Sequence, residues 1–67
     1  MVRMEIEREE DGRWLAEVPA LPGVMAYGAT ELEARTRTEA LAFRVIADRI
    51  EHGESVPAAA REFFAVA

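Results

Sequence analysis

The strongest constraint on this chain is a change in hydrophobic spacing near residue 30. Residues 1–8 alternate apolar and charged side chains, which is typical of a strand with one buried face. Residues 13–18 repeat that alternation, and residues 24–28 form a short apolar run that ends on glycine. After residue 30 the apolar side chains take the spacing of a helix. The change predicts a small sheet with one helix packed on it, an α+β fold.

Turn residues divide the first part into three strands. Asp11 and Gly12 tolerate the backbone of a tight hairpin and separate the two alternating runs. Two prolines and a glycine interrupt the chain over residues 19–23, because proline lacks a backbone donor and glycine can turn freely. We therefore predict a three-stranded antiparallel sheet with strands over residues 1–9, 13–18 and 23–28.

Local signals also bound the helix. Thr30 can accept a hydrogen bond from the amide of Glu33, whose carboxylate can return to the amide of Thr30. Gly53 is suited to end the helix, which we predict over residues 31–51. A helical wheel places one apolar stripe toward the sheet, composed of Leu32, Thr36, Ala40, Phe43, Ile46, Ala47 and Ile50.

A second apolar stripe falls on the opposite side of the predicted helix. Ala34, Leu41 and Val45 form it, and we read them either as scattered exposed residues or as a contact with a subunit or partner. The C-terminal segment over residues 61–66 is apolar, with Phe63 and Phe64 adjacent. It is predicted to be a fourth strand or an arm, and residues 1–67 a single domain.

Size and charge indicate association with another macromolecule. A chain of 67 residues without cysteine has a thin core and no disulfide, so we expect a homodimer or higher homo-oligomer. The net charge of −5 speaks against direct nucleic-acid binding and suits a small basic protein partner. No apolar run approaches the ~18 residues of a membrane span, so the expected location is the cytoplasm.

The sequence offers no convincing catalytic set. His52 and Ser55 are the only histidine and serine, and neither has the partners that a metal site or an activated nucleophile needs. Glu5 and Glu7 could hold Mg²⁺ in a nuclease, but a solvated strand face is the simpler interpretation. We therefore expect no enzyme, no catalytic residue, no cofactor and no metal. Tyr27 is interpreted as an interface residue, and Trp14 and Phe43 as core residues.

Several short motifs follow one another in a specific order. They are Asp11-Gly12-Arg13-Trp14, Glu17-Val18-Pro19-Ala20-Leu21-Pro22-Gly23, Tyr27-Gly28-Ala29-Thr30, Glu33-Ala34 and His52-Gly53-Glu54-Ser55-Val56-Pro57. In this order and spacing the chain resembles the HicB-like antitoxin family over nearly its whole length to Pro57.

The resemblance implies a degenerate, partial ribonuclease-H-like fold in a short form without a DNA-binding domain. It further implies an antitoxin of a type II toxin–antitoxin system, which neutralises a small basic RNA-cleaving toxin of the HicA type. The alternatives are an orphan oligomeric binding domain and a residual metal-dependent nuclease. The interface candidates are Leu41, Val45, Ala34, Tyr27, Phe63 and Phe64.

Overall fold

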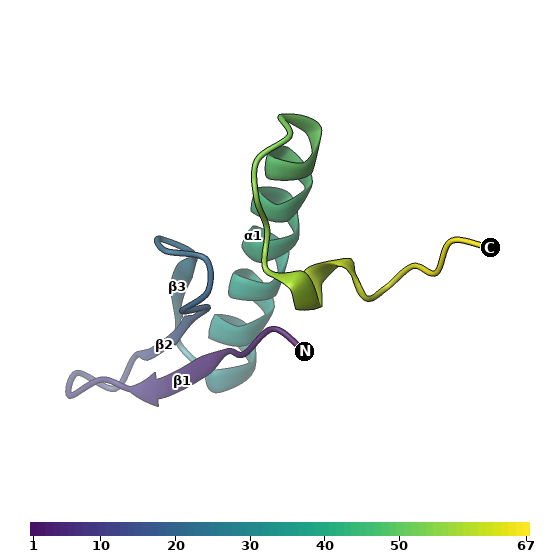
Figure 1. Cartoon of the computed structure of the whole chain (residues 1–67). Coiled ribbons are helices and arrows are strands. Elements are labelled where there is room, and N and C mark those ends of the chain that lie inside the picture. The colour runs from purple at the N-terminus through teal and green to yellow at the C-terminus, as the bar shows by residue number, and fades with distance from the viewer.

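The computed structural model describes residues 1–67 and confirms the α+β fold, with three antiparallel strands and one long helix. The helix lies across one face of the sheet, mainly over the second and third strands, and the other face carries no element (Figure 1). The elements are β1 (Glu5–Arg8), β2 (Trp14–Glu17), β3 (Met25–Gly28), α1 (Glu31–Glu51) and the short 3₁₀ helix η1 (Ala58–Arg61). The sheet order is β1-β2-β3, so β1 and β3 are its edges.

The strands are shorter than the alternation predicted, and β1 shows why. In the β1–β2 ladder Glu5 lies opposite Glu17, so the next bonding position beyond it would set Arg3 against Pro19. Proline has no backbone N–H to donate, so the ladder stops there although the alternation of burial continues back to Val2. The predicted start of the strand at residue 1 is therefore wrong, because the hydrogen-bonded strand begins at Glu5. The predicted alternation of buried and exposed side chains nevertheless extends back to Val2.

The loop between β2 and β3 supplies the centre of the core. The backbone N–H of Val18 donates to the carbonyl of Val24 at 3.0 Å, and this closes the loop and turns Leu21 inward. Leu21 is fully buried, and with Val18 and Val24 it forms the buried apolar cluster of the protein. Sequence patterning identified this segment only as a turn.

The predicted bounds of α1 are confirmed, and both ends are capped as expected in outline. The Thr30 hydroxyl accepts from the Glu33 N–H at 3.0 Å, while the Glu33 carboxylate reaches the N–H of Ala29 at 3.4 Å and not that of Thr30. At the other end Gly53 takes a φ of +69°, and the N–H of Glu54 donates to the Arg49 carbonyl at 2.8 Å. A left-handed residue just after a helix allows this closure, and glycine adopts it without strain.

The prediction of which helix face meets the sheet is wrong. Leu32, Phe43 and Ile50 are exposed, whereas Ala34 is fully buried against the sheet. Leu41 and Val45 pack against the central apolar cluster, together with Ile46 from the predicted stripe.

The reason for this helix orientation is close packing. A Cβ atom on Gly28 would lie 2.4 Å from the backbone nitrogen of Ala34, so the helix backbone approaches β3 where only glycine leaves space. Such close packing selects small side chains over large ones.

Thr38 fixes the helix to the central strand with a polar contact. It is fully buried, and its hydroxyl donates to the Ala16 carbonyl at 3.1 Å. A buried hydroxyl without a partner would be destabilising, so this bond favours one rotation of α1 over the sheet.

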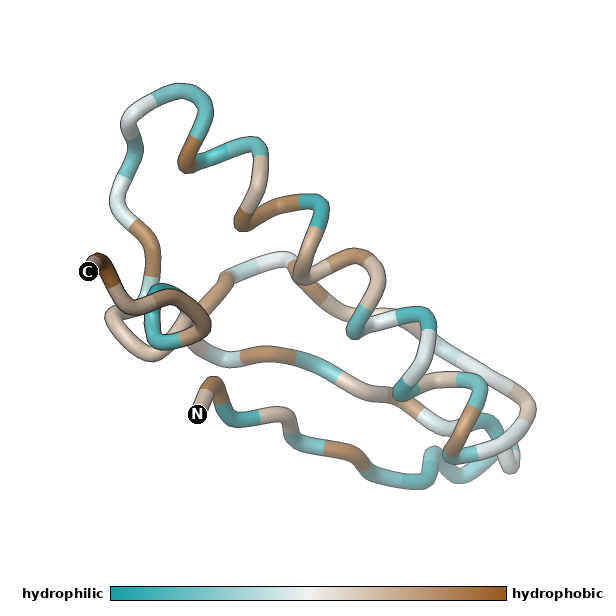
Figure 2. The backbone as a smooth tube through the Cα atoms, turned by 90° about the vertical axis from the view of Figure 1, so that its right-hand side faces the viewer, coloured by the Kyte–Doolittle hydropathy of each residue, from teal (hydrophilic) through white to brown (hydrophobic).

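The C-terminal segment forms no fourth strand. After η1 the chain leaves the body in an extended path (Figure 1), and Figure 2 colours the end of this segment as apolar. Phe63 and Phe64 are both exposed. The Phe63 ring stacks at a tilt on Phe43, with 6.1 Å between ring centroids. The exposed positions of Phe43 and Phe63 correct the expectation that Phe43 is a core residue. No helix of the chain combines the length and apolar character needed to cross a bilayer.

Candidate functional site

The sheet face that points away from α1 is the most distinctive exposed surface of the protein. We call it the outer sheet face; it carries Glu5 and Glu7 from β1, Leu15 and Glu17 from β2, and Met25 and Tyr27 from β3. These side chains share a face because alternate residues of a strand point the same way. No other element covers them (Figure 1).

Two cross-strand rows organise the outer sheet face. One row is Glu7–Leu15–Tyr27 and the other is Glu5–Glu17–Met25. Leu15 is only 8% exposed although it lies on the uncovered face, whereas Met25 and Tyr27 are each 42% exposed. The outer sheet face therefore has a buried apolar residue, Leu15, at its centre and two exposed apolar side chains, Met25 and Tyr27, on β3.

An arginine anchors the ring of Tyr27. The Arg13 guanidinium carbon lies 4.2 Å from the centroid of that ring, a cation–π arrangement. Arg13 also donates from its Nε to the Asp11 carboxylate at 2.7 Å, so much of its charge is balanced within the hairpin. The pair holds Tyr27 in place, and the residue stays partly exposed to solvent.

The remaining charge of the outer sheet face is mainly acidic. Glu5, Glu7 and Glu17 extend from it, and Arg3 balances one of them through a contact of 3.5 Å with Glu5. At the hairpin a shallow hollow of about 340 Å³ is lined by Glu9, Glu10, Asp11, Arg13 and Tyr27. Acidic side chains around an apolar patch favour a binding partner of positive charge.

Asp11 shows that the hairpin beside this face is ordered by its own hydrogen bonds. The backbone N–H of Arg13 donates to the Asp11 carboxylate at 3.0 Å, and with the Arg13 side chain it holds the pKa of Asp11 below its usual value of 3.8. Hydrogen bonds to the ionised form stabilise that form. The hairpin therefore keeps one fixed negative charge next to the arginine that anchors Tyr27.

The predicted interface candidates fall into two groups. Ala34, Leu41 and Val45 lie on the face of α1 that packs against the sheet and the core cluster. They therefore belong to the core of the single chain and are not a free surface. Tyr27 lies on the outer sheet face. Phe63 and Phe64 are exposed on the C-terminal segment, where the Phe63 ring lies against Phe43 of α1.

The structure brings together one set of potential metal ligands that sequence reasoning did not assemble. Asp48, His52 and Glu54 each offer a ligand atom, and these atoms lie within 4.8 Å of one another. All three residues are exposed, and His52 is hydrogen-bonded through Nδ1 to the Asp48 carbonyl at 2.7 Å. This arrangement also fits an ordinary capped helix end.

The alternation of the second strand already places Leu15 on the same face as Glu17, but Met25 was missed as a member of that face. The signal was available, because the odd-numbered residues of β1 and β2 include all the glutamates of those two strands. Extending that parity across the third strand would have placed Met25 and Tyr27 beside them. Comparison of the chain with known protein families, curated proteins and solved structures gives no match.

Proposed function

We propose that this protein is a binding module of the antitoxin type, which covers a small basic protein with its outer sheet face. The observation that carries the proposal is an uncovered face in which Met25 and Tyr27 are exposed beside three glutamates. An apolar centre with a charged surround is the usual anatomy of a protein interface. The expected partner is an RNA-cleaving toxin of the HicA type.

The motif order of the sequence supports the same proposal, since it resembles that of HicB-like antitoxins. The net charge of −5 complements a basic partner. On this proposal the chain is not itself an enzyme, and it acts in the cytoplasm because the RNA cut by such a toxin is there.

The proposal predicts that a small basic protein of the HicA type is encoded beside this chain, and it is tested by purifying the two proteins and mixing them. We expect the purified proteins to form a complex whose association slows as salt rises, because exposed charges are screened. We also expect RNA cleavage by the basic protein to stop when the complex forms. If the two proteins do not associate even at low salt, the proposal is refuted.

Two matched variants locate the binding face. Glu7→Lys reverses a charge on the outer sheet face and is expected to weaken the complex at least tenfold, about 1.4 kcal/mol. Glu51→Lys makes the same reversal at the exposed end of α1 and is expected to leave affinity within about twofold. Equal losses in both variants would show a general charge effect and not a binding face.

A further inference from the structure

The free edge of β1 has backbone groups that nothing in the chain satisfies. The Glu9 N–H donates to the Arg13 carbonyl at 2.7 Å, so the odd-numbered residues of this strand face β2. Backbone groups alternate in direction along a strand, so within β1 those of Ile6 and Arg8 point out of the sheet. The alternation of burial continues through the segment before β1, which places the backbone groups of Met4 and Val2 on the same outer edge. None of the hydrogen bonds outside the regular elements involves residues 1 to 8.

At the opposite edge of the sheet, which is β3, a side chain occupies one of the outward-pointing backbone groups. At β3 the Arg37 guanidinium donates to the outward-pointing carbonyl of Tyr27 at 3.0 Å. A side chain that occupies an edge carbonyl hinders the addition of another strand there. The β1 edge has no such protection, so it is the edge open to pairing.

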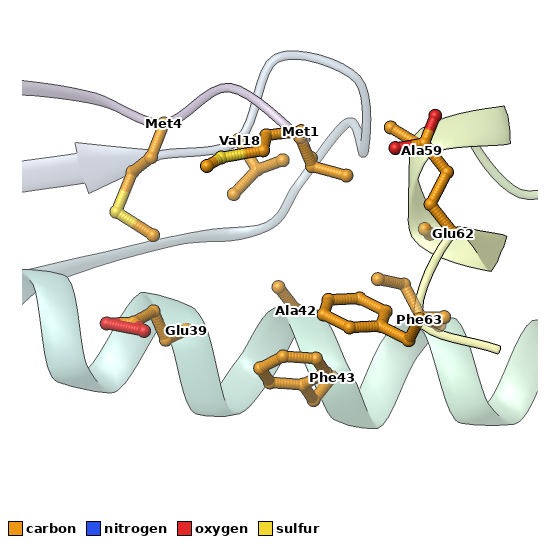
Figure 3. Close-up of a pocket in the computed structure, with 12 residues that line it drawn as sticks. Met1, Met4, Val18, Glu39, Ala42, Phe43, Ala59, Glu62 and Phe63 are labelled. Atoms are coloured by element: carbon orange, nitrogen blue, oxygen red, sulfur yellow. The ribbon is translucent and has the colours of Figure 1, made fainter.

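An apolar groove lies directly beside the open edge. It has a volume of about 480 Å³ and lies between the segment before β1, α1 and the end of η1, with Met4, Phe43 and Phe63 among its lining residues (Figure 3). The helix covers β2 and β3 more fully than β1, which leaves Met4 only partly buried. A further strand beside β1 would bring additional apolar side chains to the open side of this groove.

The charges on the β1 edge select a second copy of this chain as that strand. In an antiparallel pair centred on Met4 opposite Met4, Arg3 of each copy lies opposite Glu5 of the other. On the groove side the same register sets Val2 opposite Ile6. Displacing the register one step to either side sets Glu5 opposite Glu5 or Arg3 opposite Arg3, which like-charge repulsion disfavours.

We propose that two copies of this protein pair through residues 2–6, which are the segment before β1 and the first half of β1, in the register Met4 to Met4, forming one continuous six-stranded sheet. The bonding pairs are Met4 with Met4 and Val2 with Ile6 in both directions, so the outward backbone groups of these three residues become satisfied. The two-fold axis stands perpendicular to the sheet, which puts both helices and both grooves on the same side. The two Arg3–Glu5 contacts within the chains, 3.5 Å in each copy, are exchanged for two such contacts between the chains.

Charge reversal followed by sedimentation equilibrium tests the pairing. We expect the wild-type protein to have twice the 7.5 kDa mass of one chain. Arg3→Glu and Glu5→Arg each turn two attractive cross-strand pairs into repulsive ones, and each is expected to raise the dimer Kd about tenfold or more. Both side chains are exposed, so neither change disturbs the core.

Mixing the two variants separates pairing between chains from the ion pair within one chain. Each variant alone lacks the internal Arg3–Glu5 contact. In a mixed dimer, however, the introduced glutamate of one copy lies opposite the introduced arginine of the other, and the remaining Glu5 lies opposite the remaining Arg3. We expect the mixture to recover the dimer with an affinity within about threefold of wild type. Arg35→Glu, which breaks an exposed ion pair on the helix, is the control and is expected to leave the mass unchanged.

Three outcomes would overturn the proposal. The first is a wild-type monomer at the highest attainable concentration. The second is a dimer that both charge reversals leave intact, which would locate the interface elsewhere, for instance on the exposed Phe64 segment. The third is a mixture that stays monomeric, because a loss caused by the internal ion pair would not be restored by mixing.

Discussion

Replacing Gly28 with alanine tests how closely α1 packs on β3. A Cβ atom at residue 28 would lie 2.4 Å from the backbone nitrogen of Ala34 and 2.9 Å from its Cα. These atoms belong to the helix backbone, so no side-chain rotation relieves the overlap. The helix start would have to retreat by about 1 Å to reach the 3.4 Å of ordinary contact.

The size of the effect follows from that retreat. A gap of about 0.5–1 Å removes a quarter to a half of the dispersion energy between packed atoms, and here it affects the contacts of the fully buried Ala34. Overpacking a well-packed core costs about 1–3 kcal/mol, and a rigid neighbour favours the upper end. A chain of 67 residues has roughly 3–10 kcal/mol of total stability, so Gly28→Ala is expected to remove a large share of it.

Urea unfolding followed by Trp14 fluorescence measures this loss, because Trp14 is the only tryptophan and is half-buried. The matched control is Gly23→Ala. Gly23 has a φ of +88° and open space around its Cβ position, so alanine there adds backbone strain of about 1–2 kcal/mol without a clash. If Gly28→Ala loses no more stability than Gly23→Ala, the close approach of α1 to β3 is refuted. A Gly28→Ala chain that is unfolded without urea agrees with the expectation.

Two further predictions concern the helix face and the hairpin. Leu41→Glu is expected to lower the free energy of unfolding by more than about 2 kcal/mol, because Leu41 packs on the core cluster. Phe43→Glu, at an exposed position of the same helix, is expected to lower it by less than about 1 kcal/mol. Equal losses of the two variants in thermal melts would contradict the helix orientation. The pKa of the Asp11 carboxyl is expected below 3.8 in an NMR titration, and Arg13→Ala should retain much of the shift because the backbone N–H of residue 13 is its largest cause. Because the pKa is lower in the folded state, the stabilisation is present above the unfolded value and is lost as pH falls through the folded value; a pKa at or above 3.8 would contradict the hairpin bonding.

The parts of the fold that the sequence predicted are those set by local chemistry. The helix begins after Thr30 because the Thr30 hydroxyl accepts a hydrogen bond from a free backbone N–H of the first turn. It ends before Gly53 because Gly53 takes the left-handed conformation that lets the next N–H reach a carbonyl of the last turn. The hairpin at Asp11 and Gly12 is local in the same sense, with Gly12 at a φ of +92°. Such features depend on a few neighbouring residues, and a single sequence contains all of that information.

The face of α1 was not predictable from the helix alone. A helical wheel ranks faces by side-chain hydrophobicity, and Leu32, Phe43 and Ile50 dominate that ranking. In the structure, the missing side chain of Gly28 allows a close approach, so Ala34 and Thr38 occupy the contact instead. Which face packs therefore depends on residues of another element, and on how small they are.

Partner binding and β1 pairing are linked through one side chain. Glu5 lies on the outer sheet face, and in the proposed dimer it also pairs with Arg3 of the second copy. The two outer faces then lie on the same side of one sheet, so a basic partner on one copy approaches the charges of the other. If a partner competes for Glu5, partner binding weakens the dimer, and dimer formation weakens partner binding by the same factor, because equilibrium coupling is reciprocal. If Glu7 and Glu17 bind the partner and Glu5 stays with Arg3, both contacts persist and each dimer binds two partners.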